Sequence, residues 1–261
     1  MSNSILHQQH GSIASVTINN PQRRNAMSYA MWCQLGDVLE TLSADSPPVV
    51  LVLSGTGDQA FCAGNDISEF GQWRSSPEKL ALYHQASHRA MDLLHQAPFP
   101  VIAKIRGACV GGGLELALMC DFRYSSDNAR FAITPAKLGL GYTFSDVQRV
   151  VAILGTRGAR KLLLTGRIHN CAEALDLGLA DAVFKASDLD QGVHALASEL
   201  SHNAPLTLKA LKAALFETGR PAGEQNCERI QRLVDACHAS EDFIEGQRAF
   251  AEKRPPLFKG K

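Results

Sequence analysis

The stretch VIAKIRGACVGGGLELALMCDF, residues 101–122, contains the pattern that decides the fold. Val101 to Ile105 is predicted to be a strand, and Gly107 opens the loop that follows it. The triple glycine at 111–113 then leads directly into Leu114 to Met119, a short apolar helix. A strand, a glycine loop and a helix in this order are typical of an α/β protein.

The same order recurs on either side of this stretch. Apolar runs and turn residues predict strands at 12–18 and 49–53. Helices are expected from Ser28, which acts as a cap, and from about Pro77 to Gln96. Two short strands are predicted at 122–125 and 130–133. The repeated strand and helix units imply an α/β core with right-handed crossovers.

After about residue 145 the chain is predicted to be largely helical. Apolar spacing indicates helices at 147–154, 159–164, 172–177, 189–200, 206–216, 227–237 and 243–251, separated by glycine and proline. We expect 1–200 to form the α/β core. Residues 201–261 are expected to form a helical region that packs on this core or on a neighbouring subunit.

Composition excludes several classes of partner. Of the 261 residues, 26 are Lys or Arg and 26 are Asp or Glu, so the chain lacks the cationic surplus typical of sequence-independent nucleic-acid or membrane binding. The seven cysteines include no CxxC pair, which favours reduced thiols. No apolar run approaches the roughly 18 residues of a membrane span, and the N-terminal sequence has no targeting pattern. We therefore expect a cytoplasmic protein with neither membrane nor nucleic acid as a partner.

The glycine loops predict a site for a transient anion. A triple glycine before a helix leaves backbone N–H groups free and directs the positive end of the helix dipole at whatever lies in front. Two such donors can stabilise an enolate or oxyanion, and the turn Ala63-Gly64-Asn65 is the candidate for the second donor. Nucleotide-binding glycine motifs, the HExxH zinc pattern and the GxSxG nucleophile elbow are absent from the sequence.

At these loops the sequence resembles the enoyl-CoA hydratase/isomerase family, also called the crotonase superfamily. The matching segments, in order along the chain, are residues 20–27, 61–67, 100–107, 111–121, 131–140 and 164–180. The resemblance implies an α/β fold in which repeated ββα units form a spiral, with C-terminal helices that mediate trimerisation, often with hexamers as dimers of trimers. It also implies an acyl-CoA substrate, with coenzyme A as part of that substrate, and no metal or redox cofactor.

The resemblance carries over to individual positions. The backbone N–H groups of Asn65 and Gly112 would form the oxyanion hole around the thioester carbonyl. The adenine and pantetheine path would be lined by Ala63, Asp66 and Ile67, with Arg24 and Ala26 near the CoA head. Late basic residues such as Lys253 and Arg254 are expected to approach the phosphates, from the same or a neighbouring subunit.

Glu115 is the predicted acid–base residue. Hydratases of this family use two glutamates, and Glu115 matches the first, within an apolar stretch where desolvation should raise its pKa. The second falls at Pro135, whose side chain neither donates nor accepts a proton. Two-glutamate hydration is therefore not expected, and isomerisation, weak hydration and decarboxylation stay open. The alternative for Glu115 is a buried structural carboxyl.

The segment TPAKLGLGY, residues 134–142, is similar to that of methylmalonyl-CoA decarboxylase-like members, where a tyrosine at the Tyr142 position faces the acyl carboxylate. Those members carry a histidine at the position of Asn65, so the match is incomplete. Tyr142 is either catalytic or a packing aromatic. A third alternative is a non-catalytic acyl-CoA-binding member of the family.

Other polar side chains are assigned structural roles. His84, His88 and His95 are expected to lie on a solvated helix face rather than to bind a metal. Asp146 is expected to cap the next helix, with an acid role as the alternative. Cys62 and Cys109 lie beside the two loops without a histidine nearby in sequence to activate them.

Overall fold

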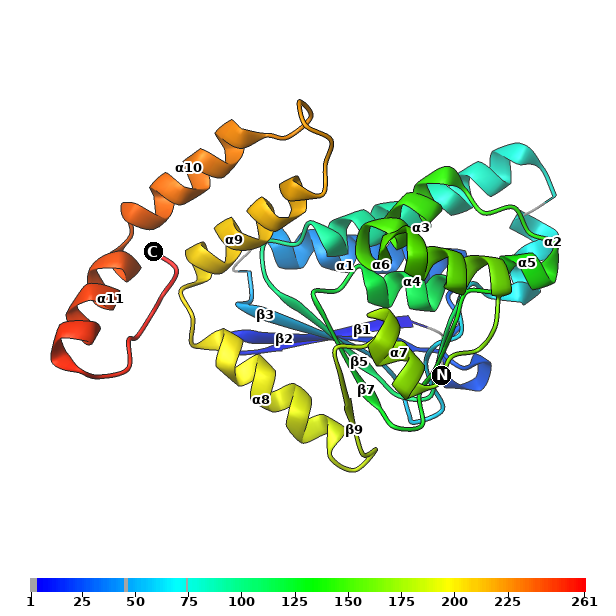
Figure 1. Ribbon diagram of the computed structural model, residues 1–261, viewed down its shortest axis with the longest axis horizontal. Helices are drawn as coiled ribbons and strands as arrows, with labels where there is room; N and C mark the ends of the chain where they lie inside the picture. Colours follow the sequence, from blue (N-terminus) through cyan, green and yellow to red (C-terminus); the bar gives the residue numbers. More distant parts are fainter. Residues whose placement is uncertain (1–3, 45–46, 74) are drawn as a thin grey trace.

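Six strands lie side by side in the larger of two sheets. The computed structural model describes residues 4–44, 47–73 and 75–261. The sheet has the order β1-β2-β3-β5-β7-β9, and only the β1–β2 pair is antiparallel (Figure 1). Its strands are β1 Ser4–His10, β2 Ile13–Asn19, β3 Val50–Gly55, β5 Val101–Ile105, β7 Phe122–Ser126 and β9 Ala182–Phe184. The four predicted strands of this sheet are confirmed to within two residues at each end.

Three short strands form a second, parallel sheet in the order β4-β6-β8. They are β4 Ala60–Cys62, β6 Ala108–Val110 and β8 Arg130–Ala132. Each follows directly on a strand of the large sheet, and one or more helices come next, so the chain repeats a ββα unit as expected. Because β4, β6 and β8 start the loops that precede the next helices, this small sheet fixes the positions of the glycine loops.

Eleven α-helices are found in the described residues. They are α1 Tyr29–Ala44, α2 Phe70–Trp73, α3 Pro77–His95, α4 Gly112–Leu118, α5 Pro135–Leu138, α6 Phe144–Thr165, α7 Cys171–Leu177, α8 Leu189–Ser201, α9 Pro205–Thr218, α10 Cys227–His238 and α11 Glu241–Glu252. Ser28 Oγ accepts from Met31 N at 3.2 Å, which confirms its capping role. Gly155, at φ 63°, interrupts α6 between the two helices predicted there.

The helices cover both faces of the large sheet. On one face α1 packs on α3, and Trp32, Leu35 and Leu94 are fully buried in the main core. On the other face lies α8 (Figure 1). Its Leu189 and Val193 pack with Val50 of β3 and Ile102 of β5. This arrangement buries the large sheet on both faces, as its continuous apolar strands predict.

The C-terminal helices extend to one end of the molecule. Lys212 of α9 donates to Phe99 O at 3.0 Å and to Asp121 Oδ2 at 2.7 Å, which ties α9 to the core. Helices α10 and α11 lie farther out, beyond α9, while α4 and α5 lie toward the opposite end (Figure 1). The division between 1–200 and 201–261 stays a prediction. No helix among the described residues is long and apolar enough to cross a membrane.

Candidate functional site

The two glycine loops predicted to form a site touch each other. Gly64 has φ 91° and Gly111 has φ 58°, values that L side chains rarely adopt. A Cβ on Gly64 would lie 2.9 Å from Val110 O and 3.2 Å from Gly112 N. Only glycine allows the loop after β4 to approach the loop after β6 this closely.

Two backbone N–H groups are available at this contact. Met27 N donates to Gly64 O and Asp66 N donates to Met27 O, both at 2.8 Å. These two backbone hydrogen bonds hold the segment on either side of Asn65 without using the N–H of Asn65 itself. Gly112 is the first residue of α4, where an N–H group has no acceptor within its own helix. The side chain of Asn65 is fixed by Trp32, whose Nε1 donates to Asn65 Oδ1 at 3.0 Å. The structure therefore brings the two predicted donors together.

Both donors line a pocket of about 340 Å³ between the glycine loops, α3 and the start of α6. The predicted residues that also line it are Ala63, Ile67, Glu115 and Tyr142. A cavity of this size accommodates an acyl group beside a thioester.

Glu115 is the buried acid of this pocket. Its side chain comes from the first turn of α4 and only 4% of the residue is exposed. Oε2 accepts a hydrogen bond from Tyr142 Oη at 2.8 Å, whereas Oε1 has no hydrogen-bond partner among the residues that the structure describes. Burial, followed by the negative charge of Asp146, raises the pKa of Glu115 to about 8. Glu115 is therefore mostly protonated at neutral pH.

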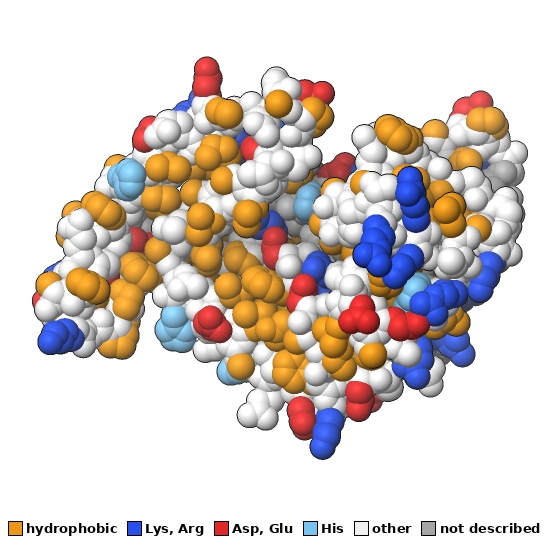
Figure 2. All heavy atoms as spheres, in the orientation of Figure 1, with side chains coloured by type: hydrophobic (Ala, Val, Ile, Leu, Met, Phe, Trp, Pro, Cys, Tyr) orange, Lys and Arg blue, Asp and Glu red, His pale blue; other side chains and the backbone are white. Residues whose placement is uncertain are grey.

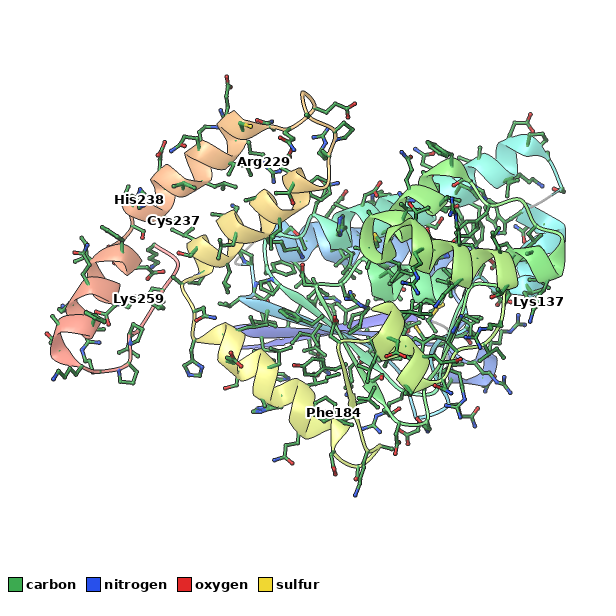
Figure 3. The ribbon with its side chains drawn as sticks, viewed as in Figure 1. Lys137, Phe184, Arg229, Cys237, His238 and Lys259 are labelled. Atoms are coloured by element: carbon green, nitrogen blue, oxygen red, sulfur yellow. The ribbon has the colours of Figure 1, made fainter. Side chains whose placement is uncertain are left out.

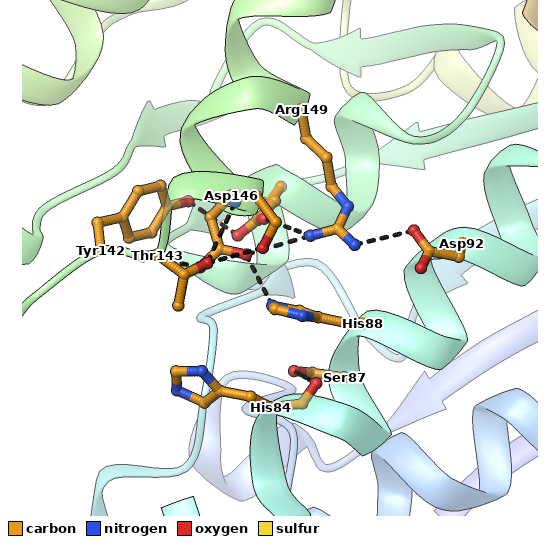
Figure 4. Close-up of polar contacts among 10 residues, drawn as sticks. His84, Ser87, His88, Asp92, Tyr142, Thr143, Asp146 and Arg149 are labelled. Atoms are coloured by element: carbon orange, nitrogen blue, oxygen red, sulfur yellow. Dashed lines mark hydrogen bonds and ion pairs between the residues drawn. The ribbon is translucent and has the colours of Figure 1, made fainter. Parts of the chain in front are cut away.

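Asp146 lies beside Glu115, in a network that joins α3 to α6 (Figure 4). His88 Nε2 lies 2.8 Å from Asp146 Oδ1, and Arg149 Nη1 donates to the same oxygen at 3.2 Å. Arg149 Nη2 also donates to Asp92 at 2.8 Å. These contacts connect residues that are more than 50 positions apart in the sequence.

The expected solvated histidine face is wrong for all three of its members, because each side chain lines the pocket or packs against another helix. His84 and His88 line the pocket, and His88 is paired with Asp146, because α3 packs against the start of α6 at this turn. His95 lies elsewhere and contacts the ring of Phe216, 5.1 Å away. No group of three or more His, Cys, Asp or Glu side chains is placed to hold a metal ion in the described part of the chain.

Asp146 also has the predicted capping function. Thr143 is the N-cap of α6, and Asp146 at the third helical position completes a capping box with it. The sequence pattern Thr-x-x-Asp carries this signal, but nothing local in the sequence places Asp146 beside Glu115. Sequence reasoning therefore missed its place in the pocket and that of His88.

The predicted residues of the CoA path have different surroundings. Ala63 and Ile67 line the pocket. Asp66 is buried and accepts from Arg23 Nη1 at 2.7 Å and from Ser68 N at 3.0 Å, so its carboxylate is engaged within the loop. This pairing and the bonds from Ser68 lower the pKa of Asp66, although its burial acts in the opposite direction.

Arg24 and Ala26 are the residues predicted near the CoA head, and Arg254 is one of those predicted to approach its phosphates. Arg24 is exposed, with φ 52°, and the buried Ala26 accepts from Asn20 Nδ2 at 2.8 Å. Arg254 pairs with Glu245 at 2.6 Å at the end of α11. In Figure 3 the labelled C-terminal residues Cys237, His238 and Lys259 lie far from Lys137 of α5, the helix that places Pro135 and Leu138 in the pocket. Within one chain, the C-terminal segment therefore lies away from the site.

The order of strands, the apposed glycine loops and the buried glutamate agree with a match to a known family. Residues 8–261 match the family model described as enoyl-CoA hydratase/isomerase. The chain belongs to this family. It is 30% identical over 253 residues to the short-chain-enoyl-CoA hydratase of Clostridium acetobutylicum, covering 97% of this chain and 96% of that protein. It is 33% identical over 266 residues to the carnitinyl-CoA dehydratase of Escherichia coli K12, covering all of both chains.

Solved structures of the enoyl-CoA hydratase/isomerase family have the same fold. The crystal structure of an enoyl-CoA hydratase/carnithine racemase from Magnetospirillum magneticum superposes with a TM-score of 0.92 at 35% identity, covering 98% of this chain and 96% of that one. An enoyl-CoA hydratase from Bacillus anthracis gives 0.91 at 28% identity, covering 98% and 99%. The chain is thus a crotonase-superfamily enzyme whose family acts on acyl-CoA.

Proposed function

We propose that this enzyme stabilises the enolate of an acyl-CoA thioester with the N–H groups of Asn65 and Gly112 and transfers a proton with Glu115. One observation carries the proposal. The buried carboxyl of Glu115 lines the same 340 Å³ pocket as both donors. Each donor to a developing oxyanion contributes about 3–4 kcal/mol in mutational tests on other enzymes.

The chemistry follows from the positions of these groups. The thioester oxygen accepts hydrogen bonds from the N–H groups of Asn65 and Gly112. These bonds stabilise the negative charge that the oxygen carries while the substrate is an enolate. Glu115, held by Tyr142, donates its proton to carbon or, once ionised, removes one. Coenzyme A enters as part of the substrate, and this scheme needs no further cofactor.

Pro135 limits which reactions of the family this site can catalyse efficiently. It lines the pocket where hydratases of the family would place a second acid, and its side chain cannot transfer a proton. A single acid–base group suits isomerisation, in which one residue removes and returns a proton. Hydration by this site is expected to be slow because a second group is needed to activate water.

Replacement of Glu115 by Gln tests the proposal. The amide keeps the shape of the side chain but cannot transfer the proton, so we expect turnover of enoyl- and 3-enoyl-CoA esters to fall by about 10²-fold or more. Affinity for the ester should stay near the wild-type value. Glu199→Gln, on the exposed side of α8, is the matched control. Unchanged turnover in Glu115→Gln would refute the role.

Decarboxylation of a malonyl-type acyl-CoA is the second candidate, favoured by the Tyr142–Glu115 hydrogen bond. The bond between the α-carbon and the carboxylate would break and CO₂ would leave. The electron pair of that bond would form the enolate, and Glu115 would then protonate the α-carbon. Release of CO₂ from methylmalonyl-CoA or ethylmalonyl-CoA is the expected result. No CO₂ release from either ester would contradict this reaction. Tight binding of the esters without turnover of any substrate would instead indicate a non-catalytic family member.

The protein is also proposed to assemble into a trimer or hexamer through its C-terminal helices. Apolar side chains gather on the surface over α8, α9 and the C-terminal helices α10 and α11 (Figure 2). Leu215 of α9 and Ile244 and Phe250 of α11 are exposed by 71%, 66% and 88%. A large exposed apolar surface of this kind favours burial against another protein surface.

A further inference from the structure

The carboxylate of Asp146 is saturated with hydrogen-bond donors. Oδ1 faces His88 Nε2 at 2.8 Å and Arg149 Nη1 at 3.2 Å. Oδ2 accepts from Thr143 Oγ1 at 2.6 Å and from Thr143 N at 3.3 Å. Donors of this number stabilise the ionised form, and they hold the pKa of Asp146 well below its usual range despite its burial.

Glu115 has the opposite surroundings. Tyr142 is its single hydrogen-bond donor in the described structure, and its buried Oε1 has no hydrogen-bond partner there. Arg149 Nη1, which donates to Asp146, is 4.0 Å from Glu115 Oε1. The two acids thus face the same guanidinium, but Asp146 receives its hydrogen bond. Two neighbouring carboxyls in one buried site resist ionising together, so one of them keeps a proton.

We propose that Asp146 is a positioning residue that holds the proton of the site on Glu115 and so sets the balance between the proton-donating and the proton-removing form of Glu115. This inference rests on the acid–base role of Glu115 proposed above. It assigns to Asp146 a function that its capping role does not require. Asp146 is too strongly stabilised as an anion to act as the base itself.

The charges around Glu115 come from three elements. Tyr142, Asp146 and Arg149 face it from the start of α6 and the preceding loop. His84 and His88 line the same pocket from α3, and Asp92 of α3 holds the other side of Arg149. Asp146 is the anion among these groups that acts directly on Glu115, while Arg149 acts in the opposite direction. Removing the charge of Asp146 should therefore ease the ionisation of Glu115.

Direct titration of the Glu115 carboxyl tests the proposal. The enzyme is labelled with ¹³C at the glutamate carboxyls, and the Glu115 signal is assigned by its loss in Glu115→Gln. In Asp146→Asn we expect the midpoint of this signal to move to lower pH by about one unit, a tenfold larger ionisation constant. Asp92→Asn is the matched control, because it removes a carboxylate that binds the same arginine but faces away from Glu115, and its midpoint should stay close to the wild-type value.

Two further variants separate charge from folding. Asp146→Ser also removes the charge and keeps a small polar group at the third position of α6, so it should show the same shift. Asp146→Glu restores the charge and should retain a high midpoint. An unchanged midpoint in a folded charge-free variant would overturn the proposal. This titration does not depend on turnover, so it tests the effect of Asp146 separately from the Glu115→Gln assay. Full activity of Glu115→Gln would refute the proposed function but not the effect of Asp146.

Discussion

Tyr142 Oη donates a 2.8 Å hydrogen bond to Glu115 Oε2 across 27 residues of sequence. This contact orients the carboxyl in the pocket, and it lowers the pKa of Glu115 against the larger effect of burial. The loop before α6 thereby acts on the acid of α4.

Replacement of Tyr142 by Phe is predicted to raise the pKa of Glu115 further above about 8. A hydrogen bond to a charged group contributes about 1.5–3 kcal/mol, which corresponds to a shift of about one to two pH units. If Glu115 acts as the acid, the alkaline limb of the pH profile of kcat will move upward by this amount. Tyr124→Phe, outside the pocket, is the control, and an unmoved limb in Tyr142→Phe would contradict the assignment.

Gly64→Ala is predicted to lower both stability and turnover. The left-handed backbone alone costs about 1–3 kcal/mol, and the added methyl group would meet Val110 O at 2.9 Å and displace the loop that carries Asn65. Loss of one oxyanion donor lowers kcat by about 10²-fold or more. Denaturant unfolding and steady-state kinetics measure the two effects.

Gly57→Ala is the matched control for that variant. Gly57 has φ 76°, but a Cβ there would meet nothing within 4 Å. We expect a comparable loss of stability with unchanged turnover. Equal loss of turnover in both variants would show that backbone strain, and not the closeness of the two loops, affects catalysis.

His169 is predicted to make the protein less stable in acid. Its ring is fully buried, neither nitrogen has a hydrogen-bond partner in the described structure, and burial lowers its pKa. The unfolded chain takes up a proton near the ordinary pKa of about 6.5, so unfolding is favoured as the pH falls below this value. His169→Gln should therefore show a smaller loss in the free energy of unfolding between about pH 7.5 and about pH 5.5. The exposed His10→Gln should behave like the wild type, and an equally steep loss in His169→Gln would rule out this origin.

Phe250→Glu is predicted to weaken assembly. A buried aromatic side chain contributes about 1.5–3 kcal/mol through removal from water, and a carboxylate at the same interface adds a desolvation cost. Sedimentation velocity should show a trimer or hexamer for the wild type and smaller species for the variant. Leu82→Glu, at a half-exposed position of α3, is the control. A monomeric wild type would disprove the proposed assembly.

The local signals of the sequence predicted the glycine loops and the helix of Glu115 correctly. Gly64 and Gly111 have a positive φ, and four of the five residues of the Val101–Ile105 strand are apolar, so the pattern can be recognised from a few neighbouring residues. Strands of three residues, such as β4 and β6, are too short to show a periodic pattern. The edge strand β1 was also missed, because Ile5 is its only buried residue and the remainder is largely polar.

The network of Asp146 could not be predicted in the same way. His88 and Asp146 meet only because α3 packs beside the start of α6, and sequence spacing alone does not determine how two helices pack. The same limit applies to Arg23 and Asp66, which lie 43 residues apart in the sequence. Pairings of this kind depend on the assembled core, whereas turns and caps depend on a few neighbouring residues.

The hydrogen bond from Trp32 to Asn65 gives the enzyme an internal fluorophore. Trp32 is fully buried, and its indole N–H is bonded to the residue that supplies one of the two proposed donors. Trp73, the second tryptophan, stacks on Tyr29 with ring centroids 4.0 Å apart. With Trp73 replaced by Phe, emission from Trp32 alone would follow the occupation of the oxyanion hole in real time, without a label and without a chromogenic substrate.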